Sequence, residues 1–227
     1  MRYTILGTSH IAKQSIQEIT TAIKNQKPGL VAVELDAPRA QALMQDAKGR
    51  ISISDIRQIG IKGFIFAKLG QIIQQKLGKM VGISPGSEMK TALELAAKNN
   101  IPLALIDQPI RVTLQNFSKA LTWREKGRFA TDVVKGLLFP KKQIAELGLD
   151  QFDLHKVPDQ KVIEHMMGQL KKRYPSIYKT LVEDRNRYMV KKLVHLLREN
   201  PEKNILVIVG AGHKSGMEEI LLKVNIV

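Results

Sequence analysis

The chain has 227 residues, enough for a large domain with its own hydrophobic core, and 44% of them are hydrophobic. It contains no cysteine, which excludes disulfide bonds, thiolate metal sites and a cysteine nucleophile. The 36 lysine and arginine residues outnumber the 21 aspartate and glutamate residues, so the formal net charge is +15. This excess favours polyanionic partners, whereas the small number of aromatic residues (six Phe, four Tyr, one Trp) argues against single-stranded nucleic acid.

The beginning of the chain and its hydropathy predict a protein without a signal peptide or a transmembrane segment. Met1-Arg2 leads directly into a short expected strand. The longest apolar runs are shorter than the roughly 20 residues that a membrane-spanning helix needs. We therefore expect a cytoplasmic or peripheral membrane protein, and the sequence leaves open a further C-terminal membrane region.

Short aliphatic runs bounded by turn-forming residues are expected to be four buried β-strands. They are Tyr3–Leu6, Leu30–Leu35, Leu103–Ile106 and Ile205–Val209. Helical patterns at about 11–25 and 38–47 follow the first and second strands, and another at about 87–99 precedes the third strand. This alternation predicts an α/β fold with a central mixed or mostly parallel sheet.

Two large basic segments are expected to be helical insertions within one domain that covers residues 1–227. The first, about 51–82, reads as one or two amphipathic helices that cover the sheet, form a mobile lid, or bind a membrane or partner. The second, about 111–200, is divided by glycine and proline into several helices. Its last long helix is expected at about Ser176–Glu199.

The strongest functional signal is a strand, a Gly-x-x-His turn and a helix, which occur together at both ends of the chain. The turns are Gly7-Thr8-Ser9-His10 and Gly210-Ala211-Gly212-His213. One such turn is a weak signal, because glycine turns after strands are common. Two of them at matching strand ends favour a functional site, and the helix starts would offer backbone N–H groups to an anion.

Carboxylates follow the other two expected strands. Glu34 and Asp36 come after the second strand, and Asp107 comes after the third. Because ligands of open α/β sheets bind outside the carboxyl ends of the strands, we expect these residues to lie near His10 and His213. A structural alternative is that the carboxylates cap helices, form turns or pair with basic side chains.

Two kinds of chemistry fit these residue types. Two histidines with one or two carboxylates can bind Zn²⁺, Mn²⁺ or Co²⁺ and activate a water molecule. Without a metal, one histidine can act as general base while an arginine stabilises negative charge. Arg111 and Arg185 are the candidate arginines, and both could instead be structural partners of Asp107 and Glu34.

Six short pieces, in this order, resemble the TraB/PrgY family, which also includes the GumN and Tiki proteins. The resemblance covers nearly the whole chain and is closest to archaeal and bacterial TraB-type members. The pieces are Gly7-Thr8-Ser9-His10, Val33-Glu34-Leu35-Asp36, Pro85-Gly86-Ser87-Glu88-Met89, Ile106-Asp107-Gln108-Pro109-Ile110, Glu183-Asp184-Arg185-Asn186-Arg187-Tyr188-Met189 and Val209-Gly210-Ala211-Gly212-His213. One position departs from the family, which usually has arginine where this chain has Gln108.

The resemblance implies a fold like that of the erythromycin-esterase and ChaN-like proteins. Its likeness to Tiki proteins implies metal-dependent proteolysis, with His10, His213 and Glu34 as metal ligands. The implied catalytic residues are Glu34, His10, His213 and Arg185. The residues expected to orient the substrate or the site are Glu88, Asp107, Arg111 and Glu183.

The resulting hypothesis is a metal-dependent, peptidase-like hydrolase that acts on peptides or extended polypeptide segments with Mn, Co or Zn. The alternative is a non-catalytic regulatory protein of the TraB/PrgY type. Such a protein would sequester a peptide, as in pheromone shutdown, or dock on an anionic membrane surface. The sequence also leaves a homo-oligomer open.

Overall fold

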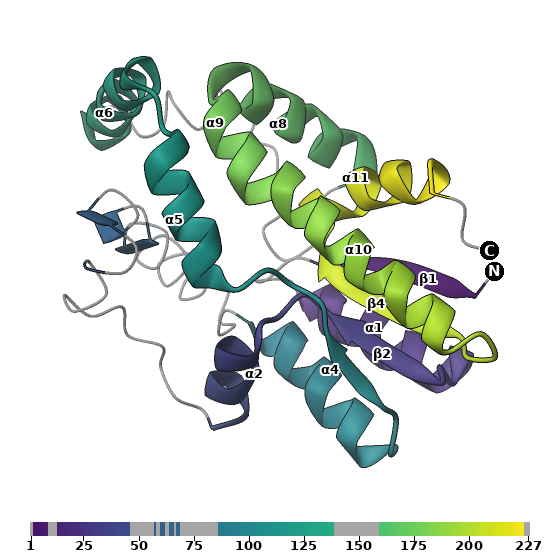
Figure 1. Ribbon diagram of the computed structural model, residues 1–227. Helices are drawn as coiled ribbons and strands as arrows, with labels where there is room; N and C mark the ends of the chain where they lie inside the picture. The colour runs from purple at the N-terminus through teal and green to yellow at the C-terminus, as the bar shows by residue number, and fades with distance from the viewer. Residues whose placement is uncertain are drawn as a thin grey trace.

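The computed structural model of the chain describes residues 2–8, 13–45, 86–138 and 159–224, with a few further positions between 57 and 68. His10 and most of the basic segment expected at about 51–82 lie outside the described residues. The described elements form an α/β fold in which helices cover both faces of a four-stranded sheet (Figure 1).

All four strands expected from the sequence are present, and every pairing between them is parallel. The strands are β1 (Tyr3–Thr8), β2 (Leu30–Val33), β3 (Leu103–Leu105) and β4 (Ile205–Gly210). Their order in the sheet is β1-β4-β2-β3, so the last strand lies between the first two. Because all strands run in one direction, their carboxyl ends, and the polar residues that follow them, meet at one edge of the sheet.

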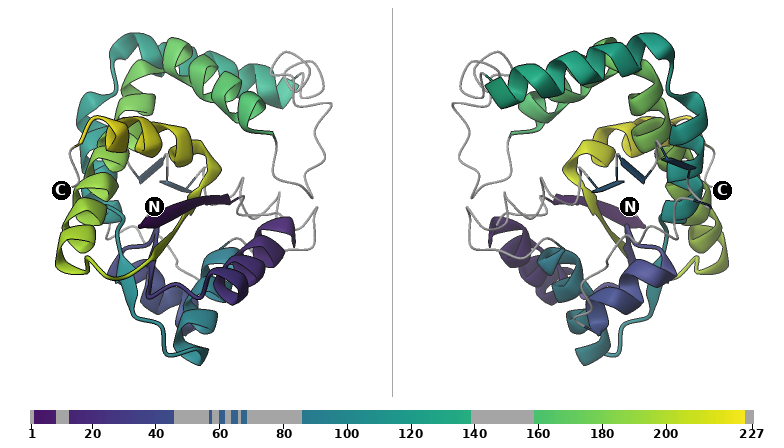
Figure 2. Two further views of the ribbon diagram at one scale, coloured as in Figure 1. Left: turned by 90° about the vertical axis from the view of Figure 1, so that its right-hand side faces the viewer. Right: turned by 90° about the vertical axis from the view of Figure 1, so that its left-hand side faces the viewer.

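Alternation along β2 and β4 fills two hydrophobic layers, because successive side chains of a strand point to opposite faces. On one face, Val31 and Val33 pack with helices α1 (Lys13–Gln26) and α4 (Ser87–Lys98). On the other face, Leu30 and Ala32 belong to the cluster formed with α10 (Asp184–Glu199) and α11 (Ala211–Leu222). Figure 2 shows these two helix pairs on opposite sides of the strands.

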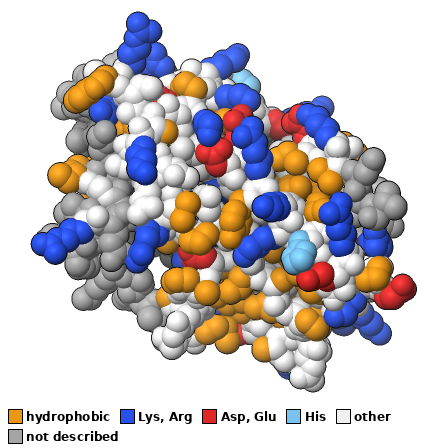
Figure 3. Space-filling view, viewed as in Figure 1, with side chains coloured by type: hydrophobic (Ala, Val, Ile, Leu, Met, Phe, Trp, Pro, Cys, Tyr) orange, Lys and Arg blue, Asp and Glu red, His pale blue; other side chains and the backbone are white. Residues whose placement is uncertain are grey.

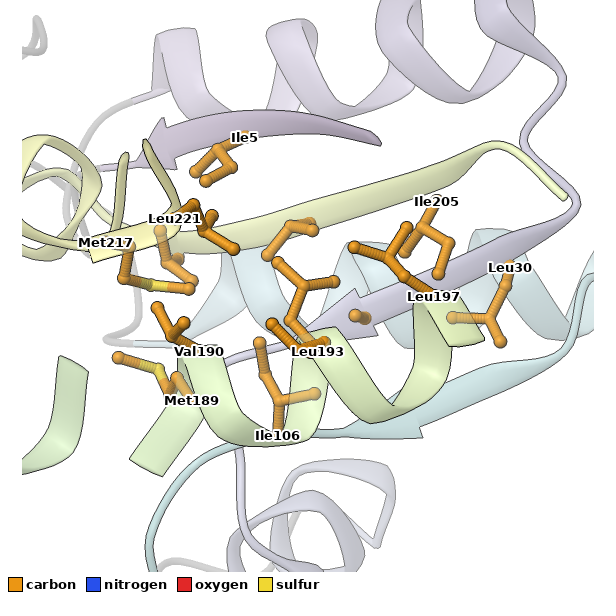
Figure 4. Packing of buried hydrophobic residues seen from close by; sticks show 14 residues of the cluster. Ile5, Leu30, Ile106, Met189, Val190, Leu193, Leu197, Ile205, Met217 and Leu221 are labelled. Atoms are coloured by element: carbon orange, nitrogen blue, oxygen red, sulfur yellow. The ribbon is translucent and has the colours of Figure 1, made fainter. Parts of the chain in front are cut away.

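Helix α10 is the main cover of its face, since it carries a stripe of apolar residues at helical spacing. Met189, Val190, Leu193 and Leu197 are almost completely buried against the sheet and α11 (Figure 4). The long helix expected at about Ser176–Glu199 is formed, but it consists of three successive segments. These are α9 (Pro175–Tyr178), the π-helical segment η2 (Lys179–Glu183) and α10.

Three further helices stand beside the sheet layers and share a small core of their own with α9. They are α5 (Ile110–Ala120), α6 (Trp123–Leu138) and α8 (Gln160–Arg173). Phe117, Tyr174 and Ile177 form this core. Helix α2 (Ala37–Met44) follows β2 and contacts α4. Within the described ranges, no helix is long and apolar enough to cross a membrane.

Two acids, the buried Glu125 and the partly buried Asp132, fasten α6 to the start of α9. The Glu125 carboxylate accepts hydrogen bonds from the backbone N–H groups of Ser176 (2.7 Å) and Thr122 (3.1 Å). Burial opposes ionisation, but these bonds outweigh it and hold the pKa of Glu125 below its usual value. Asp132 accepts from the side chains of Arg173 and Tyr174, and burial together with this carboxylate raises the pKa of Tyr174 to about 12.

Candidate functional site

Arg185, the second residue of α10, reaches the carboxyl edge of the sheet and finds an acceptor for each of its five N–H bonds. Nε donates to Asp107 Oδ1 (3.0 Å), and Nη2 donates to Asp107 Oδ2 (2.7 Å) and to Glu34 Oε1. Nη1 is 2.9 Å from His213 Nε2 and donates to the Leu181 carbonyl (3.2 Å). A guanidinium is the side chain that can donate in so many directions from one plane.

The Arg185 cluster, formed by Arg185, Glu34, Asp107 and His213, is held by charge as well as by hydrogen bonds. Burial favours the neutral form of Arg185, but the neighbouring carboxylates of Glu34 and Asp107 outweigh it and raise the pKa of the guanidinium. Glu34 follows β2 directly, and its Oε2 accepts from the backbone N–H of Gly210 (2.6 Å), where β4 ends. The cluster therefore joins the ends of β2, β3 and β4 to α10.

A second arginine, Arg39 of α2, extends the cluster along the sheet edge. Asp36 caps α2 by accepting from the Arg39 backbone N–H (3.0 Å), and it also accepts from the N–H of Ile110 (2.7 Å) at the start of α5. The Arg39 side chain donates to Asp36 and to Asp107. Burial alone would raise the pKa of Asp36. The hydrogen bond from the Ile110 N–H, together with the charge and hydrogen bonds of Arg39, outweighs burial and holds this pKa below the usual aspartate value of 3.8.

The hydrogen bonds around His213 define the tautomer of its ring. The buried ring lies in the first turn of α11, with Nε2 beside Arg185 and Nδ1 2.6 Å from Asn186 Oδ1. Because a guanidinium can only donate, Nε2 must accept, and the proton is on Nδ1, which donates to Asn186. This is a neutral imidazole, and its Nε2 atom lies 3.4 Å from Glu34 Oε1.

Two glycines allow this close packing. A Cβ atom at Gly216 would lie 2.3 Å from Asn186 Nδ2, so only glycine leaves room for the amide that orients His213. A Cβ atom at Gly7 would lie 3.1 Å from the Ala211 Cα, which is tighter than ordinary contact. The glycine of the N-terminal Gly-x-x-His turn thus lets the end of β1 approach the start of α11.

The structure brings together four of the residues that the sequence selects, namely Glu34, Asp107, Arg185 and His213. The other selected residues lie elsewhere or outside the described part of the chain. Glu88 is buried in the first turn of α4, Arg111 is exposed on α5, Glu183 pairs with Lys171 of α8 (2.9 Å), and His10 lies outside the described residues.

Arg39 and Asn186 complete the cluster but were not singled out from the sequence. The signal for Arg39 was its position three residues after a helix-capping aspartate. Asn186 lies within the piece from Glu183 to Met189 that carries the family resemblance, and its side chain is buried.

Two of the three predicted metal ligands, Glu34 and His213, lie in the described part of the chain, and His10 lies outside it. The two candidate ligand atoms in the described residues, His213 Nε2 and Glu34 Oε1, both face Arg185, and a cation between them would lie against the guanidinium. Nor does the described part of the chain contain a group of three His, Cys, Asp or Glu side chains that could hold a metal. The ligand set with His10 therefore stays a prediction.

The fold and the cluster define a class of protein: a parallel α/β domain with a buried arginine, two carboxylates and a histidine at the carboxyl edge of its sheet. The chain belongs to the TraB/PrgY/gumN family, whose model matches residues 2–224. This agrees with the resemblance seen in the short sequence pieces.

Relatives of the chain occur in archaea and in mammals. An uncharacterized protein of Methanocaldococcus jannaschii, MJ1365, is 34% identical over 97% of this chain and 53% of its own length. The TraB domain-containing proteins of human and mouse are 25% identical over 96% of this chain and 62% of their own length. The chain thus spans between half and two thirds of the length of these relatives.

Replacing Arg185 by methionine should destabilise the protein by about 3–5 kcal/mol, because two buried carboxylates lose their common cation. Arg187→Met, two residues further on at an exposed position of α10, is the matched control and should change stability by less than about 0.5 kcal/mol. Urea unfolding measures both. A fall in stability that is equal for the two variants would contradict a central role for Arg185.

The charge of Asp36 should make a contribution to stability that depends on pH. The pKa of Asp36 is 3.8 without these interactions and is lower in the folded protein. The contribution to stability is therefore fully present above pH 3.8 and is lost as the pH falls through the pKa of the folded protein. Asp36→Asn should therefore cost about 1 kcal/mol at neutral pH. Urea unfolding at a series of pH values should show this difference shrinking below pH 3.8, and a constant difference would contradict the assignment.

Proposed function

We propose that the Arg185 cluster is the active site of a hydrolase that cleaves acyl bonds, with peptides as the substrate class. The observation that supports the proposal is the direct contact between a neutral histidine nitrogen, His213 Nε2, and a charged arginine, Arg185 Nη1, at 2.9 Å. A base and an anion-stabilising cation are the two groups that hydrolysis of a carbonyl compound needs. They stand at the edge of the sheet where ligands of parallel α/β proteins bind.

In the proposed reaction, the carbonyl oxygen of the substrate replaces His213 as the acceptor of Arg185 Nη1. His213 Nε2 then takes a proton from a water molecule, and the water oxygen bonds to the carbonyl carbon. The negative charge moves to the carbonyl oxygen beside Arg185. When the tetrahedral intermediate collapses, the bond to the leaving amine or alcohol breaks, and that group takes the proton from His213.

The other residues of the cluster would position these two groups. Asp107 holds Arg185 through two parallel hydrogen bonds, and Asn186 keeps the proton of His213 on Nδ1. Glu34 lies 3.4 Å from His213 Nε2 and would stabilise the imidazolium that forms when the ring takes up a proton. We further propose a fold of the erythromycin-esterase/ChaN-like type, supported by the parallel sheet and the polar cluster at its carboxyl edge.

Hydrolysis of a set of fluorogenic peptides is the test, carried out with EDTA and, separately, with Mn²⁺, Co²⁺ or Zn²⁺. We expect cleavage in EDTA that falls about 10²–10⁴-fold in His213→Ala, the range for loss of a general base. His195→Ala, at an exposed position of α10, is the matched control and should leave the rate unchanged. Circular dichroism of both variants checks that each remains folded.

Other outcomes would overturn the proposal in distinct ways. Cleavage that requires an added metal would favour the metal-dependent, metalloprotease-like reaction implied by the resemblance and would contradict the metal-free one. Peptide binding by calorimetry without cleavage would favour the sequestering role. Cleavage that His213→Ala leaves intact would remove the Arg185 cluster as the active site.

A further inference from the structure

We propose that the outer face of helix α6, around Trp123, binds the surface of a membrane that contains anionic phospholipids. This surface uses none of the residues of the Arg185 cluster and lies outside the basic segment at about 51–82. It consists of Trp123, Arg124, Lys126 and Arg128 in the first two turns of α6. We call it the α6 surface.

Trp123 is the most unusual residue of the α6 surface. Its side chain is 84% exposed, although an indole is among the largest apolar groups that a protein carries. Lys126 Nζ lies 3.5 Å from the centre of the ring, so a cation covers one face of it. An exposed aromatic ring with an adjacent cation is the combination that suits the boundary between hydrocarbon and charged head groups.

The orientation of α6 is fixed by its opposite side. Glu125 binds the start of α9, Asp132 binds Arg173 and Tyr174, and Phe129 packs on the small helical core. The carboxylates of Glu125 and Asp132 are thus directed toward the neighbouring helices and are hydrogen-bonded there. Trp123 and Arg124 remain on the exposed side of the helix, and Arg128, also exposed, donates to the backbone carbonyl of Arg173 (2.6 Å).

The charge of this exposed side is positive. Three of its four defining residues are cations, and Lys119, in the last turn of α5, adds another exposed one nearby in sequence. Figure 3 shows lysine and arginine side chains spread over the side of the molecule seen in Figure 1, with hydrophobic and a few acidic side chains between them. Each cation near an anionic lipid surface contributes about 1 kcal/mol of attraction, and the indole adds burial at the interface.

A membrane explains this surface better than nucleic acid does. Nucleic acid would use the cations, but stacking of successive bases needs several aromatic rings, and Trp123 is the one tryptophan of a chain with few aromatic residues. The apolar side of α6 packs on the protein, so the part offered to a membrane is the exposed indole with its flanking arginine and lysine, a combination that suits an anionic lipid surface.

The chain offers a direct reporter, because Trp123 is its only tryptophan and all tryptophan fluorescence comes from the α6 surface. Vesicles of phosphatidylglycerol and phosphatidylcholine should shift the emission to the blue, and bromine-labelled lipids should quench it. Vesicles of phosphatidylcholine alone should have little effect. High salt added before the vesicles should prevent the shift, since the attraction is electrostatic.

Charge variants decide whether the α6 surface itself is responsible. Arg124→Glu with Lys126→Glu should reduce vesicle binding at least tenfold in sedimentation. Arg187→Glu with Lys223→Glu makes the same change in charge at exposed positions, one in α10 and one directly after α11, and should bind like the unchanged protein. His213→Ala should also bind normally, which keeps this test separate from that of the proposed hydrolase.

Three results would overturn the proposal. The first is unchanged emission with phosphatidylglycerol vesicles at low salt. The second is an equal loss of binding in the two double-charge variants, which would indicate general attraction without a defined surface. The third is that the protein binds RNA but does not bind the vesicles at the same salt concentration.

Discussion

A buried guanidinium connects parts of this protein that lie far apart in its sequence. Arg185 of α10 binds the residues that follow β2 and β3, and it contacts the histidine of α11. Removing a guanidinium and two carboxylates from water is costly, and the cost is offset only because every N–H of Arg185 has an acceptor. Any change in the relative positions of these elements would leave a buried donor or charge unsatisfied.

The sheet supplies the geometry that this interaction needs. Its strands are all parallel, and β4 lies between β1 and β2, so residues 34, 107 and 213 come to one edge although they are distant in sequence. Helix α10 brings Arg185 to that edge because its apolar stripe packs on the same sheet (Figure 4). The hydrophobic layer thus determines where the charged cluster forms, and the cluster in turn fixes the tautomer of His213.

The sequence predicted the strands and the meeting of Glu34, Asp107 and His213, because parallel strands end at a common edge and each of these residues follows a strand. It could not predict which residues of the run from Glu183 to Met189 face inward. The π-helical segment η2 rotates that part of the helix, so that Glu183 meets Lys171 while Arg185 meets the sheet edge. Nor could it predict Arg39, whose side chain reaches Asp107 only when α2 and the end of β3 are adjacent.

The arrangement at the sheet edge depends on a neutral His213 that presents an unprotonated Nε2 to Arg185. Nitrogen-15 NMR of the histidine rings at neutral pH tests this most directly, with His213→Gln used to assign the signals. We expect a proton on Nδ1 and none on Nε2 of His213. A proton on Nε2, or a ring that carries both protons at neutral pH, would contradict it, because neither form can accept a hydrogen bond from the guanidinium.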